Sequence, residues 1–365
     1  MERWYRAALQ GLEGIGQGRM TRLIAYFGSA QQAWLASRED WGASGCVPAA
    51  VCEALPEGRR FQAVEELASS MEKQGIRICL LEDEDYPVLL RHICRPPLLF
   101  YYYGRLPKCD RTMAVVGTRK ASNYGCNAAK KLAEELAREK FWVISGAARG
   151  IDAAAHRGAL SGGGQTLAVL GCSINTVYPA EHRQLLKQIV DGGGGVISEY
   201  PPGTPLNKGH FPARNRIISG LSRGVVVVEA AQRSGALITA DFALEEGRDV
   251  FAVPGSIFSS TSQGTHQLIE QGAKLTSCVQ DILAEYGESS KRIASESEEH
   301  SLQGMEATLY NVLSYEEAQT TDEIIMRTGL PAPEAAHGLL LLELRGFIAE
   351  QEGKRYIRVA REGIR

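Results

Sequence analysis

The sequence has neither long hydrophobic runs nor an excess of charge of one sign. Its apolar runs extend over only about four to six residues, whereas a membrane-spanning helix needs ~20. The opening residues Met1-Glu2-Arg3-Trp4 do not lead into the apolar segment of a signal peptide. Because 40 basic side chains face 43 acidic ones, the net charge is −3, and a nucleic-acid site would need local clustering of cations. We expect a cytoplasmic protein that does not bind membranes.

Several motifs of metalloproteins and enzymes are also missing. The eight cysteines are scattered, without a C-x-x-C pair or a histidine at zinc-ligand spacing. The sequence contains no G-x-x-x-x-G-K-[ST] loop, no G-x-G-x-x-G that opens a β-α unit, and no G-x-S-x-G elbow. We therefore predict no metal, no cofactor and no catalytic residue.

What the chain has in abundance is glycine, with 39 residues, and many of these follow short apolar runs. The runs predict buried strands, each followed by a helical pattern, and such alternation is typical of parallel β-α units. The predicted fold is α/β, a doubly wound, Rossmann-like, mostly parallel sheet. The predicted strands are Met113 to Val116, Trp142 to Ile144, Leu167 to Leu170, Val196 to Ile197, Val225 to Val228 and Val250 to Val253.

Smaller modules flank this domain, which we place at residues 81–286. Residues 1–80 show helical periodicity, as in Phe61, Val64, Leu67 and Met71, and predict a small helical domain. Residues 287–304 are rich in serine and glutamate and predict a linker. Within 305–365, two helices at 320–328 and 334–344 and a β-hairpin predict a winged-helix domain.

Two glycine-bearing turns follow the first two predicted strands of the sheet. Gly117, Thr118 and Arg119 lead to Ser122, and Ser145 and Gly146 lead to Arg149. A helix N-terminus after such a turn exposes N–H groups that stabilise a phosphate, although an ordinary turn with a surface arginine explains the first one equally well. After the second turn, Asp152 and His156 share a helix face, and we favour a structural role for them over an acid–base pair.

A third candidate is the cationic segment from Pro201 to Gly224. It carries Lys208, Arg214, Arg216 and Arg223 without an Asp or Glu, and Phe211 lies inside it. Cations beside an aromatic platform bind single-stranded nucleic acid. The alternative places Phe211 in the core and pairs Arg214 and Arg216 with Glu199 and Glu229.

A fourth turn contains Ser234 and Gly235. Because the carboxyl ends of parallel strands meet at one crevice, we expect the four segments to converge. The predicted DNA-contacting residues are Gly117, Thr118, Arg119, Ser145, Gly146, Arg149, Lys208, Phe211, Arg214, Arg216, Ser234 and Gly235.

Residues about 80 to 285 resemble the bacterial DNA-processing protein A family, also called Smf. The resemblance rests on segments that occur in the same order along the chain: Tyr86-Pro87 through Leu98-Leu99-Phe100, Val116-Gly117-Thr118-Arg119, Ser145-Gly146 through Ala148-Arg149-Gly150-Ile151-Asp152 with His156, Ala168-Val169-Leu170-Gly171-Cys172 with Tyr178-Pro179, Ser198-Glu199-Tyr200-Pro201, Phe211-Pro212-Ala213-Arg214-Asn215-Arg216-Ile217-Ile218, Glu229-Ala230 with Ser234-Gly235-Ala236, and Gly264-Thr265 with Gly272-Ala273.

This resemblance implies a protein that binds and protects single-stranded DNA without hydrolysing nucleotides. It implies loading of the RecA recombinase in natural transformation, with RecA and a single-strand-binding protein as partners. It places Arg119, Lys208 and Phe211 at the DNA pocket, with the Gly117 and Ser145 turns against phosphates. It also implies a homodimer whose interface, or partner surface, includes His266, Ile269 and Leu275, although many relatives have Asn at position 266. We expect Leu268, Ile269 and Leu275 to lie outside the core.

Other functions remain open from the residues alone. A nucleotide-processing hydrolase could use Glu229 or Asp152 as an acid, but it would need one phosphate site rather than a cationic strip. A transcription factor acting through the winged helix is disfavoured because the helix at 334–344 carries no Lys or Arg. Near the N-terminus, Gly14-Ile15-Gly16 is similar to a helix-hairpin-helix or SAM-like module, for which we favour packing over phosphate binding.

Overall fold

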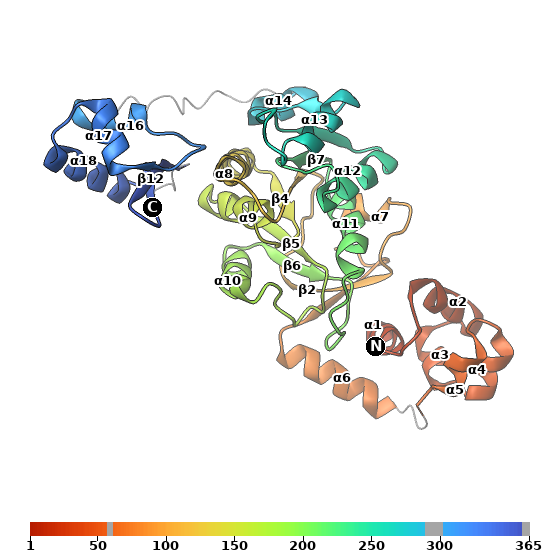
Figure 1. Cartoon of the computed structure of the whole chain (residues 1–365). Coiled ribbons are helices and arrows are strands. Elements are labelled where there is room, and N and C mark those ends of the chain that lie inside the picture. The colour runs from red at the N-terminus through yellow and green to blue at the C-terminus, as the bar shows by residue number, and fades with distance from the viewer. Residues whose placement is uncertain (57–60, 289–301, 360–365) are drawn as a thin grey trace.

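The computed structural model describes residues 1–56, 61–288 and 302–359 (Figure 1). Within these ranges no helix is both long and apolar enough to cross a membrane. In the same ranges the His, Cys, Asp and Glu side chains form no group of three that could hold a metal ion.

The centre of the protein is a nine-stranded sheet with the order β1-β2-β6-β5-β4-β3-β7-β8-β9. The strands from β3 to β9 run parallel to one another, whereas β2 pairs antiparallel with both β1 and β6. This confirms the predicted α/β class and the six predicted strands. The strands are β1 (Arg77–Leu80), β2 (Leu99–Gly104), β3 (Thr112–Val116), β4 (Trp142–Ser145), β5 (Thr166–Leu170), β6 (Gly195–Ser198), β7 (Gly224–Val227), β8 (Asp249–Ala252) and β9 (Lys274–Leu275).

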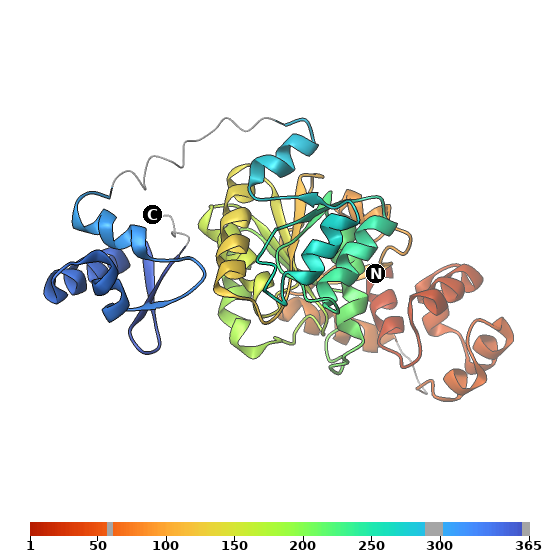
Figure 2. The same cartoon turned by 45° about the horizontal axis from the view of Figure 1, so that its top comes forward.

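Helices cover both faces of this sheet (Figures 1 and 2). Alternate residues of one strand enter different cores: Val225 and Val227 of β7 pack with α11 and α12, while Val226 packs with α8 and α9. Both faces are therefore buried, which explains why the strands read as continuous apolar runs. The helices are α7 (Val88–Arg91), α8 (Asn123–Arg138), α9 (Ile151–Ser161), α10 (Arg183–Asp191), α11 (His210–Gly220), α12 (Gly235–Glu245), α13 (Gln263–Glu270) and α14 (Val279–Glu285), with a 3₁₀ turn at Ala180–His182.

The N-terminal helices pack against one edge of the sheet. Gln10 accepts a hydrogen bond from Tyr101 Oη at 2.9 Å and donates one to the Glu199 carbonyl at 3.0 Å. The predicted boundary at residue 80 is placed too late, because β1 already belongs to the sheet. The helices are α1 (Glu2–Gln10), α2 (Gln17–Phe27), α3 (Ala30–Leu35), α4 (Arg38–Ser44), α5 (Ala49–Glu53) and α6 (Phe61–Lys73).

The C-terminal module has the predicted winged-helix elements. It contains α16 (Met305–Val312), α17 (Thr321–Thr328), α18 (Ala332–Leu344) and a sheet of β10 (Gln319–Thr320), β11 (Ile348–Gln351) and β12 (Arg355–Arg358) in the order β10-β12-β11. The module contacts α8, where Asn127 Nδ2 donates to the Arg358 carbonyl at 3.2 Å. Most of the predicted linker, residues 289–301, lies outside the described residues.

Candidate nucleic-acid interface

The strand order reverses between β3 and β7, and this position defines the crevice of the sheet. The chain moves from β3 outward through β4, β5 and β6 on one side, and through β7, β8 and β9 on the other. Ligands of open α/β sheets bind outside the carboxyl ends of the strands at such a point. The turns that contain Gly117, Gly146, Gly171 and Glu229 all follow strands at this edge.

A row of aromatic and cationic side chains lies at this edge, and we call Arg119, Phe211 and Tyr178 the Phe211 strip. The Arg119 guanidinium carbon lies 5.2 Å from the centroid of the Phe211 ring. The Tyr178 ring lies 5.3 Å from the same ring at an interplanar angle of 46°. Arg119 is exposed, Phe211 is half-buried and Tyr178 is 43% exposed. The strip therefore offers a cation and two ring faces or edges to solvent.

Gly171 allows the Phe211 ring to take this position. A Cβ atom at residue 171 would lie 2.7 Å from Phe211 Cδ1 and 3.1 Å from Phe211 Cα. Real Cβ atoms essentially never show the first of these two separations. The first turn of α11 can therefore pack at this position only because the residue after β5 has no side chain.

The buried side chain of Arg214 holds α11 against the carboxyl ends of β4 and β5. A Cβ at Gly146 would meet both Arg214 Nη2, at 2.5 Å, and Asp152 Oδ2, at 2.7 Å, so the two charged groups meet beside this glycine. Arg214 Nη1 also donates to the carbonyls of Gly146, at 2.8 Å, and Val169. Burial lowers the pKa of Arg214 to about 10, while Asp152 opposes that shift.

The predicted DNA contact of Arg214 does not fit this burial, since only 4% of the residue is exposed. Arg216 is also engaged: its Nη2 lies 2.5 Å from Glu199 Oε1, as the alternative interpretation of the cationic segment anticipated. The acidic side chain near Arg214 is Asp152 instead of Glu229. Ser145 is fully buried and donates its hydroxyl to the Val115 carbonyl at 2.7 Å, so its side chain is not available to a ligand.

The N-terminus of α8 is already occupied by a carboxylate. Glu229, which is 3% exposed, accepts hydrogen bonds from the Ser122 N–H at 2.9 Å and the Ser122 hydroxyl at 2.6 Å. A carboxylate at this position satisfies the helix dipole and repels a phosphate. A phosphate in the Ser122 turn does not fit this arrangement, and Arg119 is the exposed cation of the segment.

Asp152 and His156 do not form an acid–base pair on a surface. His156 is completely buried in α9, and its Nδ1 lies 2.7 Å from the hydroxyl of Thr166. Asp152 accepts from the Ala148 N–H at 3.3 Å and is 7% exposed. The structural interpretation of the pair fits these contacts. Arg149, in contrast, is exposed and pairs with Glu181.

The N-terminus of α12 is more open. Ser234 caps the helix by accepting from the Ala236 N–H at 3.3 Å, and no acidic residue lies in the first turn. Asn215 Nδ2 donates to the Gly235 carbonyl at 3.1 Å and so ties this turn to α11. A side chain at Gly235 would meet only open space.

Two exposed residues at the crevice were not predicted as contacts. Tyr178 was part of the family resemblance only, and its place beside Phe211 depends on the loop after β5. Arg233 precedes the α12 cap and is exposed. Lys208, which was predicted, is exposed in the loop before α11. Local sequence gives no signal for Tyr178, because its neighbour Phe211 is far away along the chain.

The predicted partner surface is only partly exposed. Leu275 is 49% exposed, Ile269 is half-buried against the core, and His266 Nε2 lies 3.1 Å from the Gly255 carbonyl. Leu268 is 4% exposed, so the expectation that it lies outside the core is wrong. Residue 268 belongs to the inward face of α13.

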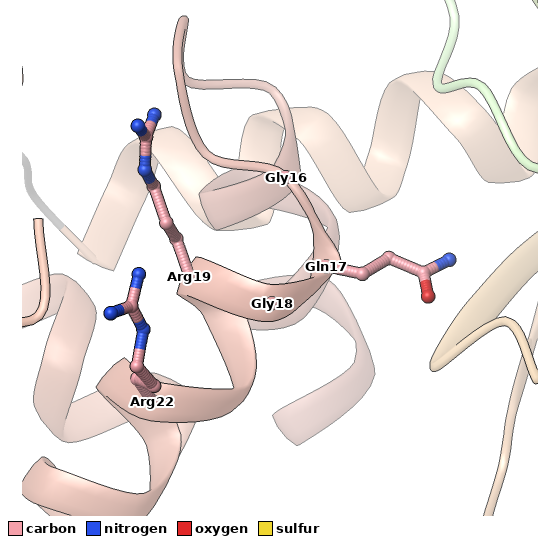
Figure 3. Close-up of a pocket in the computed structure, with 5 residues that line it drawn as sticks. All are labelled: Gly16, Gln17, Gly18, Arg19 and Arg22. Atoms are coloured by element: carbon pink, nitrogen blue, oxygen red, sulfur yellow. The ribbon is translucent and has the colours of Figure 1, made fainter. Parts of the chain in front are cut away.

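A cavity of about 380 Å³ lies at the first turn of α2, lined by Gly16, Gln17, Gly18, Arg19 and Arg22 (Figure 3). The two arginines point to one side, while Gln17 points to the other and donates to the Glu199 carboxylate. Arg19 donates to the Gly14 carbonyl. Ile15, Met20 and Leu23 are buried in the core, which agrees with a packing role for this module.

The fold and its edge define a Rossmann-like α/β protein with an added helical module and a winged helix. Residues 77–287 match the family described as DNA recombination-mediator protein A, and residues 294–354 match the DprA winged helix domain. The chain belongs to the DNA recombination-mediator protein A family.

Individual relatives agree with this membership. Protein Smf of Synechocystis sp. is 33% identical over 98% of this chain and 99% of its own length. DNA processing protein DprA of Streptococcus pneumoniae is 44% identical over 62% of this chain and 80% of its own. Its X-ray structure superposes with a TM-score of 0.63 at 39% identity, covering 78% of this chain and 98% of that one.

A second solved relative is DNA processing protein A of Helicobacter pylori, described for its single-stranded DNA binding mode. It has a TM-score of 0.51 at 28% identity and covers 57% of this chain and 95% of its own.

Proposed function

We propose that this protein is a single-stranded-DNA-binding recombination mediator that does not hydrolyse nucleotides. The observation that carries the proposal is the Phe211 strip, where an exposed guanidinium lies 5.2 Å from one aromatic ring and a second ring lies 5.3 Å beyond. The single-stranded DNA binding mode described for the Helicobacter pylori relative supports it.

The strip suits unpaired bases better than duplex DNA. Bases can stack on the rings of Phe211 and Tyr178 only when they are not paired, and every base has a face that can stack. Arg119, Lys208 and Arg233 are exposed and supply positive charge along a phosphate backbone. Buried Arg214 donates to the carbonyls of Gly146 and Val169, and these bonds hold α11 in place and so preorganise the platform.

The absence of hydrolysis is part of the proposal. The two carboxylates considered as acids, Glu229 and Asp152, accept hydrogen bonds from their own chain and are 3% and 7% exposed. Neither carboxylate lies free at the surface to reach a nucleotide. Turnover of a nucleotide by the pure protein, abolished by Glu229→Gln or Asp152→Asn, would contradict this part.

The cellular role that we propose is to protect incoming single-stranded DNA in the cytoplasm and to load RecA during natural transformation or DNA processing. RecA, and a single-strand-binding protein, are the proposed partners. A homodimer through His266, Ile269 and Leu275 would bring two Phe211 strips onto one strand, and linked sites bind with avidity that one site lacks.

Binding of labelled oligothymidylate, blunt duplex and mononucleotide tests the proposal by fluorescence anisotropy. We expect a strongly salt-dependent preference for the single strand. Phe211→Ala should weaken it about 5- to 150-fold, as for the loss of one stacked base. Arg119→Ala should weaken it and reduce the slope of log K against log salt by about 0.7, the value for one lost phosphate contact on a single strand.

Arg105→Ala is the matched control for the arginine variant. Arg105 is exposed, and its N–H donates to the Gly194 carbonyl at 2.8 Å, so it lies at the amino ends of the parallel strands, opposite the crevice. This variant should bind like the parent protein. Equal affinity for blunt duplex and single strand, or equal losses in the two arginine variants, would overturn the proposed interface.

A further inference from the structure

The two most exposed apolar residues of the α/β domain are neighbours in one loop. Ile257 is 77% exposed and Phe258 is 93% exposed, and both lie between β8 and α13. We call them the 257–258 tip. Aromatic rings contribute most to stability when they are buried. A phenylalanine that is held almost entirely in solvent can therefore contact a ligand or another molecule.

The loop below the tip is held by hydrogen bonds on both sides. Tyr124 Oη donates to the Pro254 carbonyl at 2.8 Å, and the Ala230 N–H donates to the Thr261 carbonyl at 2.7 Å. Within the loop, the Ser259 N–H donates to the Ser256 carbonyl at 3.0 Å. The tip is therefore presented by an ordered turn, and little ordering entropy remains to be lost when it is covered.

The same contacts place the loop at the edge that carries the Phe211 strip. The Thr261 hydroxyl donates to Glu229 Oε1 at 3.1 Å, and the Thr118 N–H donates to the Glu229 carbonyl at 2.8 Å. Arg119 follows Thr118 directly. Glu229 thus links the loop after β8 to the segment whose guanidinium lies over Phe211.

We propose that the 257–258 tip is a second base-stacking position, on which an unpaired base of the bound strand rests beyond the Phe211 strip. This inference depends on the proposed function and extends the path of the strand across the switch point, from the β5 side to the β8 side. Phe258 supplies the ring face, and Ile257 supplies apolar contact to the neighbouring base or sugar.

The size and charge of the tip favour a base over a protein partner. Its neighbours along the chain are Ser256, Ser259 and Ser260, so the tip itself offers two apolar side chains, whereas a stable protein interface buries about 800 Å² on each side. From Val250 through Ile269 the sequence contains no Asp, Glu, Lys or Arg. The segment itself therefore contributes no charge that repels a polyanion, and the contact adds no ionic component.

The uncharged tip gives the inference a distinctive test. In the full chain, Phe258→Ala should weaken binding of long oligothymidylates about 5- to 150-fold, the loss expected for one stacked base, without changing the salt slope. Short oligomers that reach only the Phe211 strip should bind as before. Phe258→Trp should restore the affinity, whereas Phe258→Leu, which keeps apolar volume without a ring, should not.

Fluorescence of the Phe258→Trp variant reports the contact directly. Saturating oligothymidylate should quench emission beyond the change in the parent protein, which has four tryptophans of its own. Leu35→Trp is the control, because Leu35 is 50% exposed at the end of α3 in the N-terminal module; its added emission should not change.

Three outcomes would count against the tip. An oligomer that binds the Phe258→Trp variant by anisotropy without extra quenching would overturn the tip contact and leave the proposed function intact. Loss of dimer in Phe258→Ala, measured by light scattering, would assign the tip to a second copy of the chain. A parent protein that binds no single-stranded DNA would instead refute the proposed function.

Discussion

The buried imidazole of His156 makes the protein sensitive to acid. Thr166 Oγ1 donates to the Val143 carbonyl at 2.6 Å, so the same oxygen accepts the Nδ1 proton of His156 at 2.7 Å. This arrangement fixes the neutral tautomer with its lone pair on Nε2. Among the described residues Nε2 has no hydrogen-bond partner. A second proton there would create a buried charge, and burial lowers the pKa of His156 to about 3.

The magnitude follows from proton linkage. In the unfolded chain the imidazole takes up a proton near pH 6.5, whereas in the folded protein it does so only near pH 3. The contribution to stability is therefore fully present above pH 6.5 and is lost as the pH falls from 6.5 toward 3. At ~1.4 kcal/mol per pH unit, a change from pH 7 to pH 5 removes about 2 kcal/mol of the free energy of unfolding.

Urea denaturation at pH 7 and pH 5 would measure this loss in the parent protein and in His156→Asn. The asparagine amide can still donate to Thr166 but cannot take up a proton, so the variant should lose about 2 kcal/mol less than the parent between the two pH values. His337→Asn is the control, because His337 is exposed on α18. An equal pH dependence in the parent and His156→Asn would refute the reasoning.

Three further perturbations test the platform and the assembly. Gly171→Ala should displace the Phe211 ring and lower the affinity for oligothymidylate, measured by anisotropy, about as much as Phe211→Ala does. An unchanged affinity would show that the position of the ring does not depend on a glycine at residue 171. Arg214→Met leaves Asp152 buried without the positive charge that lies near it, and it should cost about 3–5 kcal/mol in urea denaturation. Adding Asp152→Asn should restore part of this stability, and no restoration would show that the two charges are not coupled. Leu275→Glu should yield a folded monomer, because an unpaired charge in a desolvated contact raises the dissociation constant of the dimer by about two or more decades. Light scattering would measure the oligomeric state and circular dichroism would check the fold. A dimer that persists would place the interface elsewhere.

The sequence by itself determined the fold class and the edge of the sheet at which ligands would bind. Each central strand is buried on both faces, so β3, β4, β5 and β7 appear as apolar runs, and a glycine or small residue follows where the chain turns. Because carboxyl ends of parallel strands share one edge, the candidate turns could be grouped before any distance was known. The winged helix followed from helix periodicity and a hairpin in the same way.

Only the tertiary structure decided which side chains remain free at that edge. Arg214 and Arg216 lie two residues apart on one helix, yet the first bonds to the Gly146 carbonyl, 68 residues away, and the second to Glu199. Glu229 occupies the α8 N-terminus from 107 residues away. Local sequence records the charge of such residues but not the partner that neutralises it. Partners brought together by packing, through burial and hydrogen bonding, therefore separate Arg119 and Phe211 from the cations that serve the fold.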